Sequence, residues 1–151
     1  MSEWIRRALI DRLHGAYIHI DPMIVVDDIS ESDAKRHPFE GGRSPLELLF
    51  HMIYWIEFGL DLIGGEAPEY VKDADWDVRE ESWRNLVERF SKNLSNLAFM
   101  AENWVLEDKV EVSDEIVTCV GAELMGAIQH TSYHIGQLVS ARRALGLWSR
   151  P

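Results

Sequence analysis

The 151-residue sequence contains a single cysteine, Cys119. One cysteine excludes an intramolecular disulfide and any metal site built on several cysteines, and it suits a reducing compartment. A chain of this length can form one ordinary hydrophobic core without cross-links. We therefore expect a single domain over residues 1–151, in which any bound metal ion is held by nitrogen and oxygen atoms.

Basic residues are also few: 15 lysines and arginines stand against 26 aspartates and glutamates, a formal net charge of −11. This charge repels phosphate backbones and anionic lipid surfaces, so neither nucleic acid nor membrane is an expected partner. The longest apolar stretch, residues 46–64, carries Glu47, His51, Glu57 and Asp61, which are costly inside a bilayer. The first residues lack the apolar segment of a secretion signal, so we expect a cytoplasmic protein.

Apolar residues recur at helical spacing in four segments of the sequence. The second segment has the clearest beginning, because Ser44 and Glu47 form a capping box around Pro45. Asp77 and Glu80 have the same spacing and predict the beginning of the third. The predicted helices span about residues 4–15 or 4–17, 45–64, 80–103 and 120–146.

The connections between these helices are long. Residues 18–43 include a short apolar piece at residues 23–26 and otherwise have the composition of a loop with one short helical turn. Residues 104–118 alternate weakly in hydropathy, which fits either a short strand pair or an extended loop. Four helices without a central sheet predict an all-α fold, a four-helix bundle with one or two crossover connections.

Two histidines of the fourth helix, His130 and His134, are four residues apart, so their side chains share one face and can share one metal ion. His51 is a third histidine, in the middle of the most apolar helix. If the second and fourth helices are neighbours, the three imidazoles converge and leave a coordination position open, as in catalytic zinc sites. The alternative is that all three are core histidines hydrogen-bonded to their neighbours. Thr131 occupies the place of the glutamate in a His-Glu-x-x-His protease motif, which argues against such a protease.

Other polar residues near these histidines are weaker candidates. Tyr133 and Gln137 flank His134 and can orient a ligand, although ordinary packing and surface hydrogen bonding explain each of them better when it is taken singly. Cys119 is expected to be a buried, inert thiol, and His19 lies in an unusual Ile-His-Ile-Asp stretch that can line a pocket. Three carboxylates are candidate proton shuttles or orienting groups, with capping and solvation as the alternatives: Glu47, Glu57 and Glu123.

The fourth helix reads Glu-Leu-Met-Gly-Ala-Ile-Gln-His-Thr-Ser-Tyr-His-Ile-Gly-Gln-Leu over residues 123–138, followed by Arg-Arg-Ala-Leu-Gly-Leu-Trp at 142–148. Together with Ser-Pro-Leu-Glu-Leu-Leu-Phe-His at 44–51, it resembles the DinB/YfiT-like family of metalloproteins, which is unrelated to the DNA polymerase of similar name. The resemblance implies a crossed four-helix bundle, often dimeric, whose metal is held by His51, His130 and His134.

Some members of that family use a metal, usually zinc or nickel, to activate a low-molecular-weight thiol for transfer or isomerisation, others are described only as hydrolase-like, and many have no known reaction. Taken together with the residues above, the resemblance predicts a divalent-metal-dependent enzyme acting on a small molecule, and the aromatic-rich helices and the resemblance both predict a homodimer; the cytoplasmic location is expected from the N-terminal sequence. Two alternatives remain open at this point. One is a metal-dependent hydrolase, and the other is a non-enzymatic helical bundle that binds metal or a partner.

Overall fold

The computed structural model describes residues 3–150 and is mostly helical, with 59% helix and 6% strand, in agreement with an all-α class. Within this range, none of the helices has the length and apolar character needed to cross a membrane. The longer helices are α1 (Glu3–Leu13), α4 (Pro45–Ile63), α5 (Trp83–Asn103) and α6 (Val120–Ala144).

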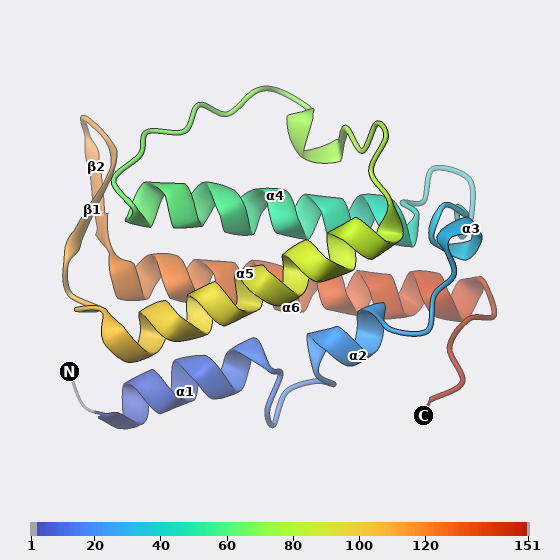
Figure 1. Cartoon of the computed structure of the whole chain (residues 1–151), viewed down its shortest axis with the longest axis horizontal. Helices are drawn as coiled ribbons and strands as arrows, with labels where there is room; N and C mark the ends of the chain where they lie inside the picture. The colour runs from blue at the N-terminus through green and yellow to red at the C-terminus, as the bar shows by residue number, and fades with distance from the viewer. Residues whose placement is uncertain (1–2, 151) are drawn as a thin grey trace.

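Helices α4 and α6 lie side by side and run in opposite directions, as Figure 1 shows. Helix α5 crosses in front of them in this view, and α1 packs against α5 and α6. The apolar faces of these helices meet in one core, whose largest fully buried side chains include Leu49, Met52, Phe90, Leu124 and Leu138. The α4–α6 pair matters most for the site, because it brings the middle of the second predicted helix against the middle of the fourth.

The start of α4 is as predicted. The Ser44 hydroxyl accepts a hydrogen bond from the Glu47 amide, and the Glu47 carboxylate accepts one from the Ser44 amide at 2.8 Å. The predicted start of the third helix is wrong. Helix α5 begins at Trp83 and is capped by Ser82, because the Asp77 carboxylate pairs with Arg79 at 2.7 Å instead of capping a helix.

The connections contain more structure than the sequence predicts. Residues 18–43 hold two short helices, α2 (Pro22–Val26) and α3 (Glu31–Ala34), each capped by the side chain that precedes it. Residues 65–82 pass over α4 and include a short 3-10 helix, η1 (Ala74–Trp76) (Figure 1). Of the two alternatives for residues 104–118, the structure has the strand pair, β1 (Lys109–Ser113) and β2 (Ile116–Cys119), which leads directly into α6.

A buried arginine connects the far end of α6 to the N-terminal half. Arg142, 4% exposed, donates hydrogen bonds to the carbonyl oxygens of Val25 and Asp27 at 2.8 and 3.0 Å. It also donates to the carbonyl of Leu147, and its guanidinium lies 4.9 Å from the ring centroid of Trp148. These contacts hold α2 and the residues after α6 against the end of that helix.

Candidate metal centre

The three histidines predicted to converge do so. His51 comes from α4, His130 and His134 come from α6, and one ring nitrogen of each lies within 4.8 Å of the others. The Nε2 atoms of His51 and His130 are 3.2 Å apart. Two nitrogens bound tetrahedrally to one zinc ion at about 2.0–2.1 Å are separated by about 3.3 Å, so this spacing fits a shared ion.

Burial keeps these imidazoles neutral. His51 and His134 are only 6% and 7% exposed, and loss of solvent lowers the pKa of both rings below the ordinary value. Burial, with added repulsion from the other two rings, lowers the pKa of His130 to about 4. Neutral imidazoles have a free lone pair at neutral pH, which is the form that binds metal.

The hydrogen bonding of the cluster does not match that of ordinary core histidines. The Nδ1 atoms of His51 and His130 are both buried without an aligned hydrogen-bond partner. Buried polar atoms are rarely left in this state, because an unmade hydrogen bond destabilises the fold. The facing Nε2 atoms of His51 and His130 can share a ligand or a hydrogen bond, and an ion bound between them would leave both Nδ1 atoms as they are. The evidence for a shared ligand is therefore the convergence of the three rings.

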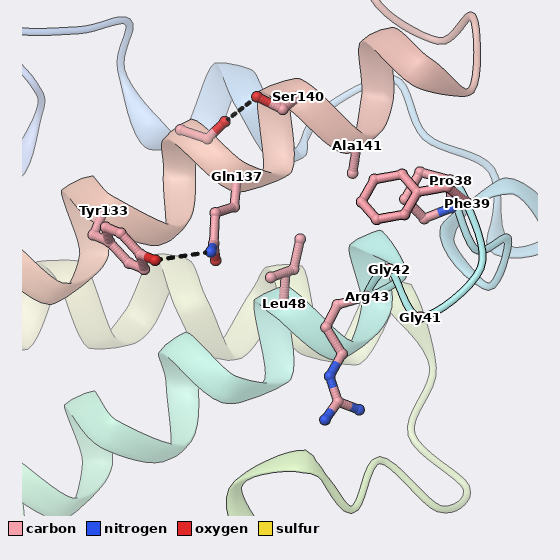
Figure 2. A pocket seen from close by; sticks show the side chains of 11 residues that line it. Pro38, Phe39, Gly41, Gly42, Arg43, Leu48, Tyr133, Gln137, Ser140 and Ala141 are labelled. Atoms are coloured by element: carbon pink, nitrogen blue, oxygen red, sulfur yellow. Dashed lines mark hydrogen bonds between the residues drawn. The ribbon is translucent and has the colours of Figure 1, made fainter.

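His134 is oriented by two residues of its own helix. Its Nδ1 lies 2.7 Å from the Gln137 side-chain oxygen, and the Gln137 amide nitrogen donates to the Tyr133 hydroxyl at 3.2 Å. Figure 2 shows this second bond, with Gln137 and Tyr133 on the same side of α6. Hydrogen bonding at Nδ1 fixes the tautomer and leaves Nε2 available, which is how neighbouring residues position metal-binding histidines. The orienting role considered for these two residues is thus supported.

His51 is positioned by residues that the sequence does not single out. Its Nδ1 lies 3.1 Å from an Asp75 carboxylate oxygen, which also accepts a hydrogen bond from the Trp55 indole at 3.1 Å. The ring N–H is not directed along the short contact, and the second Asp75 oxygen is buried without a partner. The ring of Trp76 stacks on His51 with a 3.9 Å centroid separation, and the Arg43 guanidinium lies 4.2 Å from the Trp76 centroid.

Asp75 and Trp76 both belong to η1, so the connection over α4 supplies one wall of the site. Their sequence signal is weak, because Ala-Asp-Trp in a loop has no periodicity and no metal-ligand spacing. The structure places Trp55 and Trp76 against His51.

Several other candidates lie outside the site. The Glu47 carboxylate is used by the capping box and by Arg43, and the Glu57 carboxylate binds Arg89 and Asn93 of α5. Cys119 is half-buried at the start of α6, less buried than expected. A further histidine, His19, bonds to the Ser132 hydroxyl at 2.8 Å and to the Ile20 carbonyl at 2.7 Å.

Two cavities lie along the groove between α4 and α6, and a histidine of the cluster lines one of them. One, of about 260 Å³, has His130 in its wall and extends toward the β1–β2 end of the helices. The other, of about 480 Å³, lies toward the N-terminus of α4, where Gln137 and Tyr133 line it together with the loop at residues 38–43 (Figure 2). A small molecule in the smaller cavity can therefore reach the histidine cluster at His130.

In comparisons with known proteins, no protein-family model and no curated protein matches the sequence. The resemblance to the DinB/YfiT-like family thus rests on the residues of α4 and α6 alone and stays a prediction.

Proposed function

We propose that this protein is a divalent-metal-dependent enzyme whose ion, zinc or nickel, is bound by His51, His130 and His134. The observation that supports this most is the convergence of three neutral imidazoles with nitrogens within 4.8 Å of one another. Three nitrogen ligands leave a coordination position for a substrate or solvent molecule, as catalytic zinc sites do. When bound, a divalent ion supplies Lewis acidity, which lowers the pKa of a thiol or of water.

The surrounding residues favour a thiol as the group that is activated. A free thiol has a pKa of about 8.5, whereas bulk water has one of about 15.7, so a thiol needs far less help to lose its proton. Water activation commonly relies on a nearby carboxylate as a general base. Among the described residues, Asp75 is the carboxylate nearest to the cluster, and it is already engaged with His51 and Trp55. Thiol transfer or isomerisation is therefore the leading reaction and hydrolysis the second.

Metal titration tests the ligand set. Purified, unchelated protein should contain one equivalent of metal, and the metal-free form should bind Zn²⁺ and Ni²⁺ with one-to-one stoichiometry. His130→Ala and His134→Ala should lose stoichiometric binding, and His51→Gln should weaken it by at least the 10–100-fold typical of changes around a metal site. His14→Gln is the matched control, because that histidine is exposed and lies outside the cluster. Equal affinity in wild type and His51→Gln would show that α4 and α6 do not share an ion.

Cobalt substitution separates an enzyme from a structural metal site. Low-molecular-weight thiols added to the Co²⁺ form should change its visible spectrum, because sulfur enters the open position. A spectrum that thiols, substrate-like anions and pH leave unchanged would indicate a closed site and a structural role. A screen for thiol transfer to small electrophiles, with hydrolysis of esters and amides in parallel, then identifies the reaction.

We also propose that the long helices form a four-helix bundle with crossover connections of the DinB/YfiT-like kind, and that the protein is a cytoplasmic homodimer. A groove of about 620 Å³ between α1 and α6 has mainly apolar walls, and Trp4 beside it is 70% exposed. Apolar surface of this kind is typical of an interface between subunits. A monomer at high micromolar concentration in light scattering would contradict the dimer.

A further inference from the structure

Two glycines face the smaller cavity from the two helices that form it. Gly59 is in α4, Gly126 is in α6, and both line the cavity that contains His130. Glycine inside a helix is destabilising relative to alanine. A Cβ atom added to either residue would meet no atom within 4 Å, and neither residue has a left-handed backbone. Packing and backbone geometry therefore do not require glycine here, and a larger side chain at either position would occupy part of the open volume of the cavity.

The cavity has an apolar middle and a polar group at each end. Trp55, Phe58 and Leu62 line it from α4, while Glu123 and His130 line it from α6. His130 comes seven positions after Glu123, so the two residues are about 10 Å apart along the helix. The half-buried Glu123 side chain has no ion-pair or hydrogen-bond partner within residues 3–150, and no lysine or arginine lines the cavity.

We propose that this cavity binds the substrate of the metal centre, and that the substrate is a small amphipathic molecule with a cationic group. This inference rests on the proposed function. The ammonium group of the substrate pairs with Glu123, and the apolar body of the substrate packs on Trp55 and Phe58. The reacting group of the substrate then lies at the His130 end of the cavity.

Size and charge define this class of substrate. The volume of about 260 Å³ is below the range of about 300–1,000 Å³ that accommodates drug-sized ligands, so the occupant is small. A partly desolvated carboxylate without a basic neighbour attracts a cation strongly, and the net charge of −11 raises the local concentration of cations further. Glu123 also lies in the first turn of α6, where a carboxylate stabilises the helix. Helix stabilisation by Glu123 affects the stability of the protein alone. A measurement of ligand binding therefore distinguishes this role from a role of Glu123 in binding the substrate.

Calorimetric binding of three matched probes tests the proposal on the metal-free and the zinc-loaded protein. The probes are 4-methylbenzylamine, 4-methylbenzyl alcohol and 4-methylbenzoate, which share an aromatic body and differ in charge. The amine should bind wild type more tightly than the alcohol, and the acid least. Glu123→Gln should weaken amine binding about tenfold and remove the preference for the amine, since a hydrogen bond to a charged group is lost. Glu102→Gln removes the same charge from an exposed site on α5 and should change nothing.

Filling the cavity is the second arm of the test. Gly126→Leu should abolish binding of all three probes, and Gly126→Ala should weaken their binding. Both variants should keep or raise the melting temperature, because leucine and alanine have higher helix propensities than glycine. Equal binding of amine and acid by wild type, or unchanged amine binding by Glu123→Gln or by a folded Gly126 variant, would overturn the proposal.

Zinc titrated without any probe keeps this test separate from that of the metal centre. Normal zinc affinity with no amine preference refutes the cavity assignment alone. Amine binding that depends on Glu123 in a protein that binds no zinc refutes the metal centre and leaves a cation-binding cavity.

Discussion

Replacing Asp75 with asparagine should weaken metal binding while leaving the fold almost unchanged. An asparagine side chain has the same shape as that of Asp75 and keeps an oxygen for the Trp55 indole, so the packing over α4 is retained. What is lost is the negative charge 3.1 Å from the Nδ1 atom of His51. That charge favours the tautomer with hydrogen on Nδ1, which leaves Nε2 free to face His130.

The size of the effect follows from comparable positions. Loss of a group that orients a metal-binding histidine lowers metal affinity by about 10–100-fold, or about 1.4–2.7 kcal/mol of binding free energy. The free energy of unfolding of the metal-free protein should change by less than about 1 kcal/mol, because one Asp75 oxygen is already without a partner and the other keeps the Trp55 bond.

Two measurements on the same variant check this prediction. Competition with a chromophoric chelator gives zinc affinity, and urea unfolding in the presence of excess chelator gives the stability of the metal-free protein. Asp77→Asn is the matched control, because this exposed carboxylate of the same connection pairs with Arg79 and lies away from the histidines. The reasoning is refuted if Asp75→Asn binds zinc as wild type does, or if its loss of affinity is matched by an equal loss of stability.

Three further outcomes are expected. Gln137→Leu should lower zinc affinity about tenfold because His134 loses its acceptor, whereas Tyr133→Phe should have a smaller effect; the same chelator assay compares them. The free energy of unfolding of the metal-free protein should fall by about 2–3 kcal/mol between pH 6.5 and pH 4: the folded pKa of His130 is about 4, below the unfolded value, so the unfolded chain binds more protons in this window. Urea unfolding across this range should show a shallower slope for His130→Gln, and an identical slope would contradict the assignment. Arg142→Leu should lower the free energy of unfolding by about 3 kcal/mol in chemical denaturation, since several carbonyl oxygens lose their donor, and a change below about 1 kcal/mol would show that water replaces it.

The parts of the fold that could be predicted are those with strong local signals. Ser44, Pro45 and Glu47 define the start of α4 through contacts within four residues, and Gly64 and Gly146 mark helix ends in the same way. The predicted start of α5 lies too early in the chain, because a capping spacing alone does not exclude the ion pair that Asp77 makes with Arg79. The same carboxylate can cap a helix or form an ion pair, and which of these it does depends on the local backbone geometry, which the sequence does not show.

The same distinction applies to the site. The spacing of His130 and His134 is a property of one helix, and His51 could be added because its place on an apolar helix needed an explanation. Asp75 and Trp76 could not be predicted, because they reach His51 only through the path that residues 65–82 take over α4. That path is set by tertiary packing and has no pattern in the sequence.

The division of the site between helices and a connection has a dynamic consequence. His51, His130 and His134 lie well inside α4 and α6, whereas Asp75 and Trp76 lie in a three-residue 3-10 helix between two irregular segments. Amide hydrogens in the middle of packed helices exchange only when much of the molecule opens, but those in such connections exchange by local fluctuation. The amides of residues 74–76 should therefore exchange with solvent deuterium far sooner than those of the histidines. Because residues 75 and 76 orient His51, the orientation of this histidine should change whenever the connection opens locally. These changes should be much faster than unfolding of the whole protein.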